Sequence, residues 1–135
     1  VENQESLIAA ALEKIRACKA DLFVAGPCFL AGRYGVAAGV LGSAVQSQIG
    51  IPVVTGMARE NPGADLYREP LYIIDSGDSA ARMRDVLEKM AHLAVKLMRH
   101  EPIGFPAEEV VERLGVAENF LSALEARAMW ARYGL

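Results

Sequence analysis

The sequence predicts an α/β fold in which helices cover an open, mostly parallel sheet. Three observations indicate this class. Short apolar runs that end in glycine, such as DLFVAG at 21–26, suit buried strands. Longer segments between them repeat apolar residues at helical spacing. The resulting order of strand, helix, strand, loop, strand and helix is typical of βαβ units and therefore of a parallel sheet.

Helices are predicted on both sides of the first strand. Residues 5–18 form a surface helix, because apolar residues recur along one side of it; they are Leu7, Ile8, Ala11, Leu12 and Ile15. The next helix runs from Arg33 to about Ile49 and is rich in small residues. Its interior glycines, Gly39 and Gly42, each cost about 1 kcal/mol relative to alanine, so we expect close packing against a neighbouring backbone there.

Two further strands and a long helix follow. The strands are expected at 51–56 and 70–77. The helix begins with Asp78 or Ser79 as its N-cap and carries an apolar stripe of Met83, Leu87, Met90, Ala94 and Leu97. These elements suit a three-layer, doubly wound sheet of the flavodoxin or Rossmann type.

A proline-punctuated connection divides the chain. Residues 1–106 are expected to form the α/β domain, itself part of a larger substrate-binding domain. Residues 107–135 are expected to form a helical tail or extension, whose apolar side consists of Phe120, Leu121, Leu124 and Met129.

Composition excludes several classes of function. The 135 residues are 53% hydrophobic and 23% charged, as in globular rather than disordered proteins. A net charge of −3 gives no basic footprint for nucleic acid. No apolar run approaches the roughly 20 residues that span a bilayer, and we expect no signal peptide. Two cysteines are too few for a disulfide scaffold, so we expect the cytoplasm. His92 and His100 lack acidic or cysteine companions at ligand spacing, so we expect no metal site.

All three predicted strands end in turns that contain glycine, at 25–35, 55–63 and 75–80. Ligands of open parallel sheets collect outside the carboxyl ends of the strands. We therefore expect the three turns to share one edge of the sheet and to form a binding site there.

The third turn places Ser76, Gly77 and Ser79 at a helix N-terminus, where unpaired N–H groups favour a carboxylate or phosphate. An N-cap without any ligand is the alternative. From the middle turn we select Thr55, Gly56, Met57 and Asn61, because a hydroxyl and a bare backbone suit a ligand. A turn at Asn61-Pro62-Gly63, in a loop that merely covers the sheet edge, is the alternative.

Arg33 and Tyr34, at the start of the second helix, complete the predicted site. A guanidinium binds a carboxylate through paired hydrogen bonds, and a phenol can orient it. The alternative is a surface arginine paired with Asp65 or Glu60. The spacings of phosphate-binding loops are absent.

Cys28 ends a strand close to a helix N-terminus, a position that can lower the pKa of a thiol. Cys28 is therefore a candidate nucleophile, and the alternative, an inert buried cysteine, is the more common case.

Three long strings of the sequence invite comparison with a family. They are DLFVAGPCFLAGRYGVAAG, GIPVVTGMARENPGADLYREPLYII and SGDSAARMRDVLEKMAHLAVKLMRHEPIGFPAEE. In order and spacing they closely resemble the amino-terminal region of component B (selenoprotein B) of the glycine, sarcosine, betaine and D-proline reductase family. The resemblance runs from about Asp21 to Glu109.

This resemblance implies a subunit of an oxygen-sensitive complex that reductively cleaves the C–N bond of a small amino acid or its N-methylated relative. A partner subunit with a pyruvoyl group helps to activate the substrate. A selenocysteine or cysteine of component B then attacks the carbon and releases the amine. The carboxymethyl group passes to a selenoprotein A-like carrier. No cofactor is expected in this chain, and homo-oligomer formation is left open.

The chain departs from the family pattern at several positions. Cys28, Leu30 and Ala58 stand where the family commonly has alanine, asparagine and an aromatic residue. The reactive selenocysteine or cysteine belongs to a later region, so its role is not transferred to Cys28. We expect the chain to supply substrate-binding and subunit-docking surface. The alternative is a non-catalytic α/β module that binds a nucleotide or small anion, or assembles with partners through its apolar helices.

Overall fold

The structure, a computed structural model, describes residues 2–103. Its elements are α1 (Glu2–Ala17), β1 (Phe23–Ala25), α2 (Gly32–Gln48), β2 (Val53–Met57), α3 (Pro62–Tyr67), β3 (Tyr72–Asp75), the 3₁₀ turn η1 (Ala80–Arg82) and α4 (Met83–Met98). The predicted α/β class is confirmed. The helical tail expected at 107–135 lies outside the described residues.

The sheet is open and parallel, with the strands in the order β1-β2-β3. Val24 of β1 lies opposite Val54 of β2, which lies opposite Tyr72 of β3. Successive side chains of a strand point to opposite faces of a sheet. The register therefore creates rows of side chains that cross the sheet on each face.

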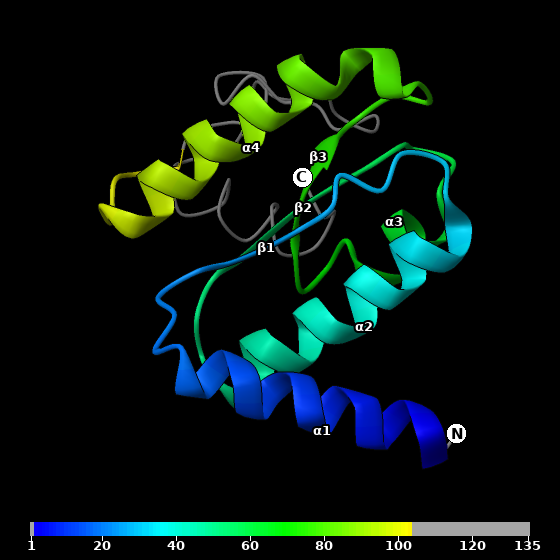
Figure 1. The fold of residues 1–135 in the computed structure, drawn as a ribbon. Helices are drawn as coiled ribbons and strands as arrows, with labels where there is room; N and C mark the ends of the chain where they lie inside the picture. The colour runs from blue at the N-terminus through cyan, green and yellow to red at the C-terminus, as the bar shows by residue number, and fades with distance from the viewer. Residues whose placement is uncertain (1, 104–135) are drawn as a thin grey trace.

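Helices cover both faces of the sheet (Figure 1), as expected for three layers. Helices α1, α2 and α3 contribute to the core on one face, which is built around Leu12, Ala38, Val45, Val53, Met57, Ala64, Leu71 and Ile73. Helix α4 forms the core on the other face, with Val54, Ile74, Val86, Met90 and Leu93. Within residues 2–103, each helix is too short or too polar to cross a lipid bilayer.

The glycines of α2 allow the close packing that the sequence predicts. A Cβ atom at Gly39 would collide with the ring of Tyr67. One at Gly42 would lie 3.0 Å from Cγ1 of Val53 and 3.1 Å from Cδ1 of Leu71. The neighbours at these two positions are side chains rather than the expected backbone.

Helix α3 replaces part of the loop predicted between the second and third strands. Asn61 is its N-cap and Pro62 its first residue. Both residue types are favoured at these places, because the Asn side chain accepts from a free N–H group and proline lacks one. The turn signal at these residues is therefore the beginning of a short helix.

Helix α4 begins later than predicted and turns a different stripe to the sheet. Ser79 caps η1, and α4 follows from Met83. Met90 is buried as expected, but Met83 and Leu87 are exposed, so this part of the prediction is wrong. The buried positions are Val86, Met90 and Leu93, which also recur at helical spacing. Periodicity alone could not choose between the two stripes.

Candidate functional site

Backbone hydrogen bonds tie the three turns together beyond the carboxyl ends of the strands. The N–H of Cys28 donates to the carbonyl oxygen of Gly56 at 2.7 Å. The N–H of Ala58 donates to the carbonyl oxygen of Phe29 at 3.0 Å. The N–H of Ser76 donates to the carbonyl oxygen of Met57 at 3.0 Å. The predicted meeting of the turns is confirmed, and they form a joined edge.

Asn61 is buried at the centre of this edge. Its Nδ2 donates to the carbonyl oxygens of Phe29 at 2.7 Å and Ala31 at 3.4 Å. Its Oδ1 accepts from the N–H of Gly63 at 2.9 Å. A Cβ at Gly35 would collide with this side chain, so α2 carries glycine where Asn61 approaches. The Asn61 side chain is thus already engaged by the protein.

Thr55 of β2 and Cys28, which lies between β1 and α2, form a buried pair. Oγ1 of Thr55 has no conventional hydrogen-bond partner, and the Cys28 thiol lies beside it. Burial raises the pKa of the Cys28 thiol, and the contact with the Thr55 hydroxyl offsets only part of this rise. A thiol in this state is a poor nucleophile at neutral pH, because the thiolate is the reactive form.

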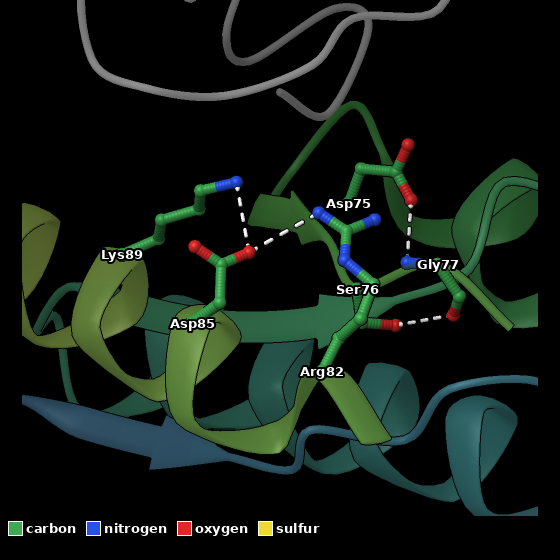
Figure 2. Close-up of polar contacts among 6 residues, drawn as sticks. All are labelled: Asp75, Ser76, Gly77, Arg82, Asp85 and Lys89. Carbon is green, nitrogen blue, oxygen red and sulfur yellow. Dashed lines mark hydrogen bonds and ion pairs between the residues drawn. The ribbon is translucent and has the colours of Figure 1, made fainter. Parts of the chain in front are cut away.

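The third turn is organised by its own side chains (Figure 2). Gly77 has a φ of +64°, and its N–H donates to Oδ1 of Asp75 at 2.9 Å. The buried Ser76 donates its hydroxyl to the carbonyl oxygen of Gly77 at 3.0 Å. Ser79 accepts from the N–H of Ala81 at 3.2 Å, which is the expected N-cap. Ser79 therefore caps η1 without a ligand, whereas α4 begins after Arg82 with no side-chain cap.

A cluster of charges follows on η1 and the first turns of α4 (Figure 2). Oδ2 of Asp85 lies 3.2 Å from Nζ of Lys89 and 3.1 Å from Nη2 of Arg82. Hydrogen bonds from Lys89 and then Arg82 hold the pKa of the Asp85 carboxyl below its ordinary value. Arg82 and Lys89 are thus both paired with a carboxylate that lies three or four residues away along the chain.

Arg59 is a residue of this edge that the sequence analysis did not select. Its Nε donates to Oδ2 of the buried Asp75 at 2.8 Å, and its side chain is 41% exposed. Asp75 also accepts from the N–H of Gly77. The carboxylate thereby fixes the guanidinium through Nε, while no other protein partner of Arg59 occurs among the described residues. Its place, two residues beyond β2 in the selected turn, was the available signal.

Arg33 and Tyr34 are exposed at the beginning of α2. Arg33 lines a largely apolar groove of about 930 Å³ between α1 and α2. Leu7, Val36 and Val40 also line this groove, which we call the α1–α2 groove. Asp65, one predicted partner of Arg33, lies 3.9 Å from Arg68 instead.

The predicted site residues, together with Arg59, therefore fall into a buried and an exposed group. Thr55, Met57, Asn61 and Ser76 are buried, and Gly56 accepts from Cys28 through its carbonyl oxygen. Exposed polar groups near the edge come from Arg33, Tyr34, Arg59 and Ser79. In the part of the chain that the structure describes, no three His, Cys, Asp or Glu side chains are arranged to hold a metal ion.

Comparison with known proteins identifies relatives along nearly the whole chain. The model of the glycine/sarcosine/betaine reductase selenoprotein B family matches residues 1–129. The glycine reductase complex component B subunit gamma of Peptoclostridium litorale is 50% identical over 118 residues, 87% of this chain and 27% of that protein. The sarcosine reductase complex component B subunit beta of Peptoclostridium acidaminophilum is 46% identical over 119 residues, 88% of this chain and 27% of that protein.

A betaine reductase complex component B subunit beta of Peptoclostridium acidaminophilum is 45% identical over 89 residues, 66% of this chain and 20% of that protein. The chain thus spans only about a quarter of the length of the relatives it matches most extensively, 27% in two of them. No solved structure matches the sequence.

Proposed function

Because the chain belongs to the glycine/sarcosine/betaine reductase selenoprotein B family, we propose that it forms the carboxylate-binding part of a component B. The substrate is a small amino acid or its N-methylated relative, and the reaction of the whole complex is reductive cleavage of its C–N bond. The chain itself binds and orients the substrate and docks to other subunits.

The observation that carries the carboxylate-binding role is the state of Arg59. A buried carboxylate, Asp75, holds Nε at 2.8 Å, which fixes the guanidinium plane at the carboxyl edge of β2. The Nη atoms are then available as a pair of parallel donors, the geometry that a carboxylate accepts. A fixed guanidinium loses less side-chain entropy on binding than a free one. Arg59 therefore suits a substrate whose invariant group is a carboxylate.

The redox nucleophile is proposed to lie outside this chain, whose two cysteines are Cys18 and Cys28. Cys28 is buried and its pKa is raised, so it offers little thiolate. Cys18 is exposed but lies between α1 and β1, before the amino end of that strand. We accordingly assign the reactive selenocysteine or cysteine to a later part of component B and the pyruvoyl group to a partner subunit. A selenoprotein A-like carrier takes the carboxymethyl group.

The α1–α2 groove supports the docking role. Leu7 is an exposed apolar residue at this groove, and Arg33 adds a cation to it. Contiguous exposed apolar surface is typical of protein contacts. The relatives are named as components of reductase complexes, which is consistent with a subunit contact at this place.

Titration of the complex tests the proposal. The chain, assembled with its partner subunits, is titrated with glycine, sarcosine and betaine by calorimetry. We expect binding of at least one, and the Arg59→Gln variant should lose at least tenfold in affinity, or about 1.4 kcal/mol.

Arg68→Gln is the matched control, because Arg68 is 40% exposed and also paired with a carboxylate. The complex with Arg68→Gln should bind the carboxylates with the same affinity as the complex with the parent chain. Absence of affinity for all three carboxylates, or an equal loss in both variants, contradicts the proposal. Binding of a nucleotide or inorganic anion instead of these carboxylates identifies the alternative α/β binding module.

A further inference from the structure

We propose that the outer edge of β1 binds a parallel β-strand from the part of component B that follows the region spanned by this chain. The proposal rests on family membership and on the length of the relatives, of which the chain covers 27% in two cases. It concerns assembly of the subunit and requires no assumption about the substrate.

The first observation is unequal burial along one row of the sheet. Val24 and Val54 are neighbours in register and face the side of the sheet that α4 covers. Val54 is fully buried, whereas Val24 is 46% exposed. Helix α4 packs against β2 and β3 (Figure 1). The surface of β1 on this face is thus apolar and incompletely covered.

The backbone of β1 is also positioned to pair. The N–H of Phe23 donates to the carbonyl oxygen of Pro52 at 3.0 Å, on the side of β2. Backbone groups of successive residues in a strand point to opposite sides. The N–H and C=O of Val24 therefore point away from β2, toward the outer edge, where a further strand would find them.

The sequence of this edge lacks the usual protection against pairing. Exposed edge strands commonly carry charged residues or proline. Residues 22–25 contain neither. The opposite end of the described sheet differs, because β3 has Ile73 and Ile74 buried on its two faces. Of the two end strands, β1 is the one whose apolar side chain remains exposed.

Handedness selects the same edge. Helices α2 and α3 lie on one face while the chain steps from β1 to β2 to β3. Helix α4 leaves β3 on the opposite face. Because about 98% of parallel crossovers are right-handed, a crossover on that face returns the chain across the sheet in the opposite direction. The strands β2 and β1 already occupy those places, so the first position that no strand within residues 2–103 occupies is the outer edge of β1.

The course of the chain after α4 agrees with this direction. Helix α4 runs antiparallel to the strands and ends toward the side of the sheet where β1 begins (Figure 1). Ile103 is buried in the cluster that also receives Leu22, the residue directly before β1. The described part of the chain therefore ends at the amino side of the sheet, the side on which any strand parallel to β1 has its first residue.

Hydrogen–deuterium exchange tests whether the edge is paired. The amide aligned with Val24, which points away from β2, is followed in the full-length Peptoclostridium litorale subunit. Its exchange rate, divided by the intrinsic rate of that sequence, is compared with the same ratio for Val24 in the 135-residue chain. We expect this amide to exchange at least tenfold more slowly in the full-length subunit, whereas the amide aligned with Phe23, already bonded to β2, should change little. Equal exchange in the two proteins overturns the proposal.

Cross-linking identifies the occupant. A photoreactive residue replaces the residue aligned with Val24 in the full-length subunit, and the cross-linked peptide is identified by mass spectrometry. A peptide from the same subunit beyond the region aligned with this chain is expected. A peptide from a second copy or another subunit overturns the proposal. The residue aligned with Leu66, exposed on α3, is the control and should not cross-link to that peptide. Neither measurement uses substrate, so failure of the carboxylate titration leaves both results interpretable.

Discussion

Nδ2 of Asn61 donates to the carbonyl oxygen of Phe29 at 2.7 Å and so connects the turns that follow β2 and β1. The same side chain caps α3 through Gly63. One buried amide therefore fixes the relative positions of two turns and a helix. The shape of the carboxyl edge depends on it.

Replacement of Asn61 by alanine is expected to lower the free energy of unfolding by about 2–3 kcal/mol, because buried carbonyl groups lose their donor. Urea denaturation measures the loss. Asn61→Asp is the informative companion, since it retains an acceptor for the N–H of Gly63 but has no N–H donor for Phe29. The free energy of unfolding of Asn61→Asp should therefore fall by nearly as much as that of Asn61→Ala. A change below about 0.5 kcal/mol in both variants contradicts the connecting role.

Alanine at Gly39 is expected to destabilise the protein although alanine is the better helix former. The gain in helix propensity is about 1 kcal/mol, whereas overpacking against the Tyr67 ring costs about 1–3 kcal/mol. Gly42→Ala is the control, because its Cβ would meet Val53 and Leu71 only at 3.0 Å and 3.1 Å. Thermal unfolding should rank Gly39→Ala as the less stable variant. The opposite ranking would show that α2 and α3 separate readily at Tyr67.

The sequence was sufficient for the sheet and the larger helices because their signals are local. Apolar runs gave the three strands, and helical spacing gave α1, α2 and α4, with boundaries that differ by a few residues. Helix α3 was missed because its six residues are too few to show periodicity, and Pro62 was interpreted as part of a turn. The capping preference of Asn61 was the signal that could have identified it.

The location of the candidate site could be predicted from the sequence, but the exposure of its individual side chains could not. Parallel topology brings the three turns to one edge, whatever their side chains. Which side chains face solvent depends on long-range contacts. The 32-residue separation between Asn61 and Phe29 is one example, and the 16-residue separation between Arg59 and Asp75 is another. Such contacts bury the predicted Asn61 and expose the unselected Arg59, and no local pattern in the sequence reveals them.

The two cysteines should differ strongly in reactivity. Iodoacetamide at pH 8 is expected to alkylate the exposed Cys18 and to leave the buried Cys28 largely unmodified until denaturant is added. Mass spectrometry of the native protein measures both sites in one sample, so Cys18 is the internal control. Rapid native alkylation of Cys28 would revive its candidacy as a nucleophile.

The same thiol predicts a dependence of stability on pH. Because the pKa of Cys28 is raised in the folded protein, mainly by burial, folding favours the neutral thiol. Its contribution is complete below the pKa of the unfolded thiol, about 8.5, and is lost as pH rises through the higher folded value. Cys28→Ala should therefore show a smaller decline in the free energy of unfolding above that pH than the parent chain. If the free energy of unfolding of the two proteins declined equally with pH, the pH dependence would not come from the Cys28 thiol.

Arg59 and Asp75 should show a non-additive response to substitution. Arg59→Gln leaves the buried Asp75 carboxylate with the N–H of Gly77 as its remaining donor among the described contacts. Because the Arg59 side chain is 41% exposed and its charge is partly screened by water, we expect the free energy of unfolding to fall by about 1–2 kcal/mol, less than is typical of a fully buried pair. Asp75→Asn retains an oxygen for Gly77 and removes the charge. The double variant should therefore be more stable than the sum of the single losses predicts, as measured by urea denaturation. Strict additivity would mean that Arg59 does not neutralise Asp75, and would weaken the argument that the carboxylate fixes the guanidinium for a ligand.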